Sequence, residues 1–470
     1  MIQQFRRFCA GLIVSLSAFG GFAGAAENAD LLLSGPLFPA IETFHLENGM
    51  QVGVVPDARA TFVTHMVWYR VGAADEASGK SGIAHFLEHL LFKGTEKFPG
   101  NAIDRTVKAV GGNHNAFTSH DYTGYFQKVT REHLPLMMEI EADRMMNVDF
   151  NAADVDVERQ VVLEERARGI ETSPRAQLSA AMDLALFKNH PYRRPIIGWR
   201  NEIESLNVDE IREFYERFYT PANAILIVAG NVTLDEVKSL AGKVYAPLQN
   251  RAPAYQPERP QEPDELRMRQ VITVRDPKIT NESITITFRV PSFRTGLPGE
   301  NEAIDMLSEI LSGTTRSRIY RDMVIDRQIA TSAGAYAGSG ARDDTTFALY
   351  ATPKGEVTLE EMEKELFAAI DRIARDGVTS DELDRARKRL FANAIYAQDS
   401  ASGLANILGR TLIVGNRLED IRSWPDRLRA ITPAQIQAVA AKFFDPDKAV
   451  IGLLRRPIDF ETASLKKDPA

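Results

Sequence analysis

Three polar side chains interrupt an otherwise apolar stretch, and their spacing could support metal chemistry. Residues 81–93 read Ser-Gly-Ile-Ala-His-Phe-Leu-Glu-His-Leu-Leu-Phe-Lys. The apolar residues surround the axis of the predicted helix, so we expect this helix to be largely buried. His85, Glu88 and His89 share one face, because residues three and four apart are neighbours on a helix. Two imidazoles four residues apart can reach one metal ion, which would offset the cost of burying them beside a carboxylate.

The order of these residues is H-x-x-E-H, the inverse of the H-E-x-x-H zinc motif. A catalytic zinc takes three protein ligands and leaves one position for water, so a third ligand must come from elsewhere in the chain. His114, His120 and His133 qualify by residue type. The simplest alternative is a coincidental pair of core histidines beside a glutamate whose hydrogen bonds are satisfied.

A better third ligand lies in the predicted helix over residues 155–168. Glu158 and Glu165 fall on one stripe of this helix together with valines. Glu164 points about 100° away from Glu165, so the two neighbours are not interchangeable. We expect Glu165 to be the ligand and Glu158 to orient a ligand or assist the water. The alternative is that both are surface glutamates on an acidic helix.

The stretches around these residues resemble one known family. It is the inverzincin family of zinc metallopeptidases, which includes pitrilysin, insulin-degrading enzyme and the mitochondrial processing peptidase. The likeness spans the chain after its first residues and is carried by residues 70–72, residues 82–95, Asn115-Ala116-Phe117-Thr118 and residues 158–165.

The resemblance implies a role for each matching residue. His85, His89 and Glu165 would bind one zinc ion per chain, Glu88 would be the general base, and Glu158 would support the site. It also implies that an extended peptide adds as a β-strand to the edge strand. The substrate-binding residues of that strand would be Asn115, Ala116 and Phe117.

One feature departs from the family pattern. Its active sites are completed by an Arg and a Tyr from a C-terminal half, whereas this chain has Val324 and Thr331 at the matching positions. Arg321 and Arg327 are near but out of register. Family members of this length usually pair two chains around a closed chamber. We therefore expect a homologous second subunit that carries the Arg–Tyr pair, or a homodimer.

The hydrophobic patterning predicts an α+β fold with two homologous domains, each an antiparallel-rich sheet packed with helices, as in the processing peptidases. Residues 207–229 and 432–454 match at a constant offset of 225, each reading as a capped helix, a Pro-bearing turn and an apolar strand. The predicted strands are 51–55, 64–71, 114–118, 123–129, 271–274, 283–289, 332–337 and 345–351. The predicted long helices are 131–147, 153–168, 174–187, 300–311, 359–376 and 380–397.

The first residues have the pattern of an export signal. Arg6 and Arg7 precede an apolar run too short to span a bilayer, and Ala23-Gly24-Ala25 is typical of a cleavage site. We expect residues 1–25 to be a signal peptide and the protein to be exported, to a Gram-negative periplasm, with no membrane span. The expected parts are a zinc-binding domain at 34–246, a Pro-rich linker at 247–266 and a homologous domain without a metal site at 267–458.

Composition narrows the function further. The net charge of −8 over 470 residues argues against a nucleic-acid binder, and the single cysteine excludes a disulfide framework. All eight histidines lie between His45 and His190, so the second half cannot build a histidine metal site. We expect a zinc metalloendopeptidase subunit that hydrolyses extended or unfolded peptides. The rivals are a non-catalytic scaffold or peptide-binding subunit, and a zinc hydrolase of non-peptide substrates.

Overall fold

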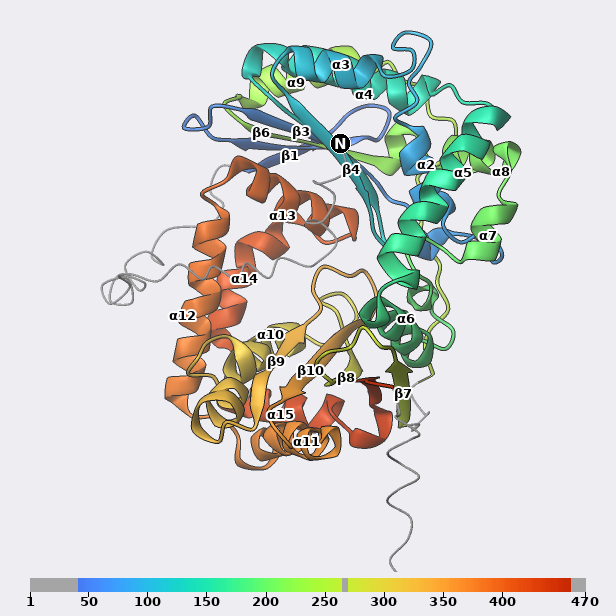
Figure 1. The fold of residues 1–470 in the computed structure, drawn as a ribbon. Coiled ribbons are helices and arrows are strands. Elements are labelled where there is room, and N and C mark those ends of the chain that lie inside the picture. The colour runs from blue at the N-terminus through green and yellow to red at the C-terminus, as the bar shows by residue number, and fades with distance from the viewer. Residues whose placement is uncertain (1–40, 264–268, 458–470) are drawn as a thin grey trace, which may run out of the picture. The chain divides into compact units, whose positions relative to one another are not determined.

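The computed structural model describes residues 41–263 and 269–457, and these build two sheets, each packed with helices (Figure 1). The predicted α+β class is therefore confirmed. The predicted signal peptide at 1–25 lies outside the described residues. No helix in the described ranges is long and apolar enough to cross a membrane.

The two sheets share one strand order, except that the first sheet has one more strand, β1, at its edge. The first runs β1-β2-β6-β3-β5-β4 and the second β7-β11-β8-β10-β9. In each sheet one pair is parallel, β2 with β6 and β7 with β11, and the other pairs are antiparallel. The strands are β1 Glu42–His45, β2 Gln51–Pro56, β3 Val63–Tyr69, β4 Asn113–Thr118, β5 Thr123–Val129, β6 Ala224–Gly230, β7 Gln270–Arg275, β8 Ser283–Val290, β9 Ala330–Ala337, β10 Thr345–Pro353 and β11 Val450–Arg455.

The repeat seen in the sequence corresponds to a structural repeat. Helix α8 (Val208–Phe218) leads through a 3₁₀ turn into β6, and α15 (Pro433–Phe443) leads through another into β11. Both helices begin with a capping box, from Asn207 and Thr432, which satisfies backbone N–H groups at the helix start. The two central strands thus arise from the same local signals in each half.

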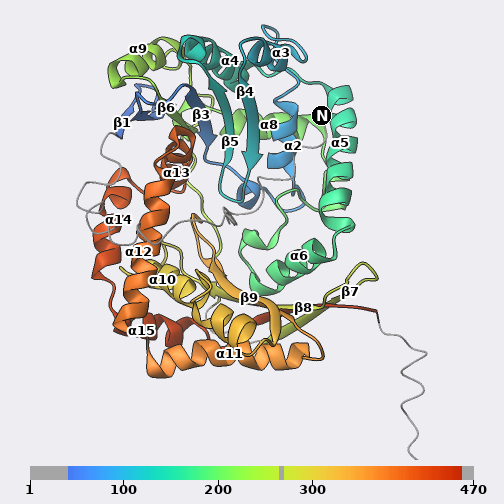
Figure 2. The same ribbon diagram turned by 60° about the vertical axis from the view of Figure 1, so that its left-hand side comes forward.

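Helices cover both faces of each sheet (Figure 1, Figure 2). On the first sheet, α4 contacts β3 and α9 contacts β2, whereas α13 lies against β2, β3 and β6. On the second, α10, α11 and α15 contact one face and α6 the other. The helices not yet given are α2 Ile83–Leu90, α3 Ala102–Ala109, α4 Leu134–Asn147, α5 Ala152–Arg166, α6 Pro174–Leu186, α7 Arg200–Ser205, α9 Leu234–Val244, α10 Glu300–Ser312, α11 Leu359–Asp376, α12 Ser380–Ala397, α13 Ala401–Ile413 and α14 Leu418–Ala430.

Each half contributes one helix that packs on the sheet of the other half. Helix α6 of the first half packs on β7 and β11, and α13 of the second packs on β3 and β6. Glycines allow the close approach: a Cβ on Gly452 would lie 2.2 Å from Met182 Sδ, and one on Gly409 would lie 2.3 Å from Trp68 Cε2, both too close for van der Waals contact. A division of the chain at the linker alone therefore assigns α6 and α13 to one half although each packs on the sheet of the other.

The Pro-rich segment contributes a buried cation. Up to residue 263 it forms no helix or strand, as its prolines predict. Arg259 is only 4% exposed, and its guanidinium contacts Asp75 (2.8 Å), Asp121 (2.5 Å) and Asp343 (2.9 Å). One arginine thus joins the segment to carboxylates of both halves.

Candidate active site

Helix α2 carries the H-x-x-E-H residues, and a buried glutamate and a glycine fix its start. Glu76 accepts hydrogen bonds from the backbone N–H groups of Gly82 and Ala84, both at 3.0 Å. Gly82 has φ +89°, and a Cβ there would lie 2.5 Å from the carbonyl oxygen of Ile197. The backbone before the motif can therefore reach this position only with glycine.

Three predicted ligand residues come together between α2 and α5. One side-chain donor atom from each of His85, His89 and Glu165 lies within 4.8 Å of the others. Glu165 Oε2 is 3.3 Å from His89 Nε2 and 3.9 Å from His85 Nε2. Tetrahedral zinc with bonds of about 2.0–2.1 Å needs donors roughly 3.3 Å apart. The donor set and its spacing fit a zinc ion with one position left for water.

Glu158 lies behind His89 and fixes the orientation of its ring. Glu158 Oε1 is 2.9 Å from His89 Nδ1. A carboxylate can only accept, so Nδ1 carries the proton and Nε2 keeps its lone pair for a metal. The other Glu158 oxygen is 2.5 Å from Lys93 Nζ, a contact that sequence reasoning missed. Burial raises the pKa of Glu158, but the bonds from His89 and Lys93 outweigh it and lower the pKa to about 2.

The cluster attracts positive charge. Burial lowers the pKa of His85 to about 4, and neighbouring His89 adds to this effect. Burial also lowers the pKa of His89, but hydrogen bonds to Glu158 and Glu165 outweigh it and raise the pKa to about 10. Two carboxylates around two imidazoles thus stabilise a cation, whether a proton on His89 or a metal ion.

Glu88 lies on the same helix and has the properties of a general base. Its side chain is buried, and Thr118 Oγ1 donates a hydrogen bond to Glu88 Oε2 at 2.5 Å. Burial raises the pKa of Glu88 to about 7, against the lowering effect of the Thr118 bond. A general base works best with a pKa near the working pH.

Strand β4 forms one edge of the first sheet and ends at Thr118, beside Glu88. Its outer backbone groups pair with no other strand in the described ranges. The Phe117 ring packs on Trp68 (4.8 Å between centroids) and over Gly124, so its side chain is structural. Asn115 Oδ1 accepts a hydrogen bond from the N–H of Ala116. The Phe117 and Asn115 side chains are therefore engaged by contacts within the chain itself.

The remaining histidine candidates lie apart from the cluster. His114 Nε2 contacts Asp104 at 3.2 Å, and His120 Nε2 donates to the carbonyl oxygen of Arg194 at 2.9 Å. His133 precedes α4. The group of described residues that could hold a metal ion includes none of the three.

Glu164 differs from its neighbour as its helical position predicts. Its side chain is 68% exposed and pairs with Arg168 at 2.8 Å, on the outer side of α5. Glu165, one residue later, is 40% exposed and belongs to the cluster. The helix therefore separates two adjacent glutamates by environment.

The positions that replace the Arg–Tyr pair lie in the second half. Val324 is in a π-helical segment, Tyr320–Asp326, and Thr331 Oγ1 donates to the carbonyl oxygen of Thr352. The nearby arginines are held by carboxylates, Arg321 by Asp326 and Arg327 by Glu365.

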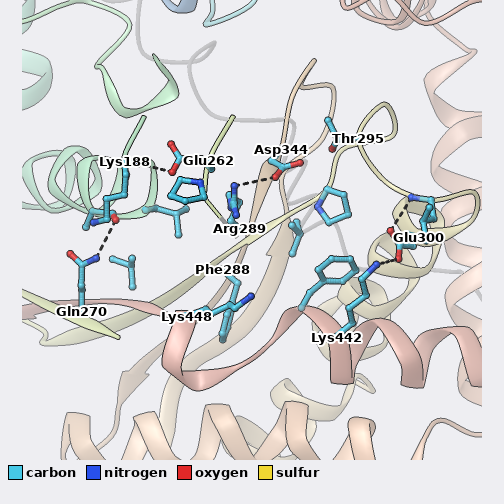
Figure 3. Close-up of a pocket in the computed structure, with 18 residues that line it drawn as sticks. Lys188, Glu262, Gln270, Phe288, Arg289, Thr295, Glu300, Asp344, Lys442 and Lys448 are labelled. Atoms are coloured by element: carbon cyan, nitrogen blue, oxygen red, sulfur yellow. Dashed lines mark hydrogen bonds and ion pairs between the residues drawn. The ribbon is translucent and has the colours of Figure 1, made fainter. Parts of the chain in front are cut away.

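A separate cavity of about 480 Å³ lies at one end of the second sheet (Figure 3). Its charges are largely paired: Lys442 contacts Glu300, Arg289 lies 3.5 Å from Asp344, and Glu262 accepts from backbone N–H groups. None of the clustered histidines or glutamates lines it.

Comparison with known proteins places the chain in one family. Residues 52–199 match the profile described as "Insulinase (Peptidase family M16)", and residues 205–390 match that of the "Peptidase M16 inactive domain". The chain is 29% identical to a zinc protease, PqqE, of Helicobacter pylori over 89% of this chain and 93% of that protein. It is 31% identical to an uncharacterized zinc protease of Mycobacterium bovis over 80% and 84% of the two chains.

Solved structures agree. The crystal structure of a protease from Helicobacter pylori superposes with a TM-score of 0.80 at 28% identity, covering 89% of this chain and all of that one. This chain belongs to the M16 peptidase family, and the predicted family resemblance is confirmed. Its relatives are named zinc proteases.

Proposed function

We propose that this chain is a zinc-dependent metalloendopeptidase subunit that hydrolyses extended or unfolded peptides. The observation that carries the proposal is the convergence of His85, His89 and Glu165 beside a buried Glu88. The first three would hold one zinc ion per chain, and Glu158 would orient His89.

The proposed chemistry divides between the ion and the chain. Zinc, when bound, supplies a Lewis acid that acidifies a coordinated water and polarises the peptide carbonyl. Glu88 takes the proton of the attacking water and later donates it to the leaving amine. Thr118 holds the Glu88 carboxylate through its hydroxyl. Burial of Glu88 keeps it basic enough for this exchange near neutral pH.

The substrate would bind by strand addition to β4. The free edge of this strand ends at Thr118, next to Glu88, so a peptide paired with Asn115, Ala116 and Phe117 would pass the proposed base. Backbone pairing requires an extended chain, which favours unfolded peptides over folded proteins.

A partner subunit would complete the site. Val324 offers no hydrogen-bond donor, and the Thr331 hydroxyl is occupied by Thr352. A homologous chain, or a second copy of this one, would close around the peptide, and the homologous chain would bring an Arg–Tyr pair. The same observation favours the second candidate function, a non-catalytic peptide-binding subunit.

Residues 1–25 would direct export to a Gram-negative periplasm before cleavage. The proposed parts remain the zinc-binding domain at 34–246, the linker at 247–266 and the second domain at 267–458, with α6 and α13 each packed on the sheet of the other half.

The test is an assay of the purified chain, alone and with homologues that co-purify from its source, on an unstructured quenched-fluorescence peptide. We expect cleavage that disappears with a zinc chelator and returns with added zinc. If the zinc-loaded wild type binds the peptide but cleaves it under none of these conditions, the result would support the non-catalytic candidate instead.

A further inference from the structure

A cavity of about 290 Å³ lies among α10, α12, α13 and α14 of the second half (Figure 2). Helix α14 contacts each of the other three. Apolar and aromatic side chains form much of the cavity wall, namely Phe293, Ile407, Val414, Ile421 and Trp424. Small-molecule sites in proteins are typically apolar cavities of about 300–1,000 Å³ with a few polar groups. This cavity is at the small end of that range, with room for one side chain and its attached polar group.

The cavity takes up a place that corresponds to the motif helix of the first half. Helices α2 and α10 each begin after a glycine in the left-handed region. His85 is the third residue after Gly82, and Glu302, which lines the cavity, is the third residue after Gly299. Glu302 is 2% exposed and pairs with Arg427 at 2.6 Å. Where the first half has a metal-binding histidine, the second half therefore has an ion pair beside an open cavity.

The acids of the cavity wall are engaged, whereas one cation is not. Glu302 pairs with Arg427, and Asp420 accepts a hydrogen bond from the backbone N–H of Arg417 at 2.7 Å. Arg410 on α13 also lines the cavity and is exposed. No hydrogen bond or ion pair joins its guanidinium to the residues that the structure describes. The cavity therefore offers an anion an unpaired positive charge.

The other polar groups of the wall also favour a ligand that accepts hydrogen bonds. A guanidinium and the indole N–H of Trp424 can only donate. The side-chain amides of Asn301 and Asn416 line the cavity and bond to none of the described residues. A carboxylate accepts several hydrogen bonds at once, and its bonds from a guanidinium are among the strong ones. An apolar wall beside these donors fits an anion that carries an apolar group.

We propose that this cavity, the α13–α14 pocket, binds a carboxylate attached to one large apolar or aromatic group. Arg410 would pair with the carboxylate, and Ile407, Ile421 and Trp424 would cover the apolar group. Two sources carry this chemistry, a small carboxylic acid and the C-terminal residue of a peptide. The second source rests on the proposed function, because each hydrolysed peptide bond leaves a new C-terminal carboxylate.

Calorimetric titration of the purified chain with N-acetylphenylalanine tests the pocket. N-acetylphenylalaninamide has the same ring without the charge, and N-acetylalanine has the same carboxylate without the ring. We expect N-acetylphenylalanine to bind at about one site per chain and about 10–100-fold more tightly than either of the other two, the typical effect of one charge-assisted hydrogen bond or one buried ring.

Substitutions in the pocket should remove this preference. Arg410→Gln should lower the affinity for N-acetylphenylalanine to that for its amide. Ala394→Leu adds bulk to the wall and should weaken binding of both ring-bearing probes. Arg385→Gln removes an exposed arginine of α12 that pairs with Asp381 outside the cavity, and it should change neither affinity. Thermal melting checks that each variant is folded, and Arg410→Gln should melt like the wild type because the exposed Arg410 forms no ion pair with the described residues.

Two unstructured peptides that end in phenylalanine distinguish the sources, one with a free C-terminal carboxylate and one amidated. Both are titrated into the Glu88→Gln variant, so that binding is measured without the proposed hydrolysis. Tighter binding of the free-acid peptide that disappears with Arg410→Gln identifies a peptide end as the ligand. Arg410-dependent binding of N-acetylphenylalanine with no preference between the two peptides identifies a small acid.

The outcomes separate this inference from the proposed function. Equal affinity for N-acetylphenylalanine and its amide, or a preference that survives Arg410→Gln, overturns the pocket. A wild type that cleaves no peptide while Arg410-dependent binding persists contradicts the proposed catalysis and leaves the pocket standing.

Discussion

The two halves of this molecule share a fold and differ in chemistry. The five strands of the second sheet have the same order as the first sheet without β1. In each half, one helix starts directly after a glycine in the left-handed region, Gly82 before α2 and Gly299 before α10. Only α2 carries histidines. On α10, Glu302 pairs with Arg427 and Glu309 with Arg389.

The comparison shows that the fold accommodates an acid with a raised pKa on the corresponding helix of each half, α2 and α10. The fold alone does not determine what that acid does. In the first half, burial raises the pKa of Glu88 to about 7 beside two imidazoles. In the second, burial raises the pKa of Asp305 to about 7, with Glu302 and Glu309 adding to it. Among the described residues, Glu88 lies beside a group that could hold a metal ion, whereas Asp305 does not.

The first prediction contrasts the two buried acids. Glu88→Gln should lower peptide hydrolysis by about 10²–10⁴-fold while zinc content stays at the wild-type level, because an amide cannot accept the proton of the water. Asp305→Asn should leave hydrolysis unchanged. Rates from initial velocities with zinc measured on the same samples decide this, and near wild-type cleavage by Glu88→Gln would remove it as the base.

The second prediction concerns what the second half lacks. If a partner supplies the Arg–Tyr pair, a homologue that co-purifies with this chain should raise its activity by about 100–1,000-fold, the typical effect of one donor to the developing oxyanion. The double substitution Val324→Arg with Thr331→Tyr should raise the activity of the lone chain in the same direction. A pure single chain at full activity, unaffected by any such homologue, would contradict the division of labour.

The third prediction addresses the residues behind His89. Glu158→Gln and Lys93→Met should each weaken zinc binding by about 10–100-fold, since Lys93 holds the carboxylate that orients the imidazole. Lys93→Arg should restore most of the affinity. Competition with a zinc-binding dye gives the zinc dissociation constant of each variant. An unchanged constant for Lys93→Met would show that the ion pair between Lys93 and Glu158 does not support zinc binding.

The fourth prediction is a pH effect on stability from the second half. The folded-state pKa of Asp305 is raised to about 7 from an ordinary 3.8, so its stabilising contribution is present at low pH and is lost as pH rises between those values. Asp305→Asn should therefore be more stable than wild type at pH 8 and close to it near pH 4. Denaturant unfolding at both pH values gives the free energy of unfolding of each protein. The same difference between Asp305→Asn and wild type at pH 4 and at pH 8 would refute the raised pKa of Asp305.

Much of the fold was predictable because its signals are local. Alternating strands, capped helices and the repeat at residues 207–229 and 432–454 depend on neighbours in sequence. The cluster of His85, His89 and Glu165 was predictable from helix geometry, since the three residues lie on helix faces that periodicity identifies.

What the sequence did not reveal depends on tertiary contacts. The packing of α6 and α13 on the opposite sheets leaves no local signal, and α13 itself was missed together with α3, α7, α9, α14 and β1. Arg259 lies in a segment whose prolines indicate only an extended path, yet it is buried among three carboxylates. The contacts of Thr118 with Glu88 and of Lys93 with Glu158 join residues that are far apart in sequence.

Zinc content tests the central claim most directly. Metal analysis of the purified chain after exposure to zinc and removal of excess should give about one ion per wild-type chain and per Glu164→Ala chain. His85→Ala, His89→Ala and Glu165→Ala should each retain little or none, because each loses one of three protein ligands. Wild-type chains without zinc, or full zinc in all three variants, would contradict the account of this site.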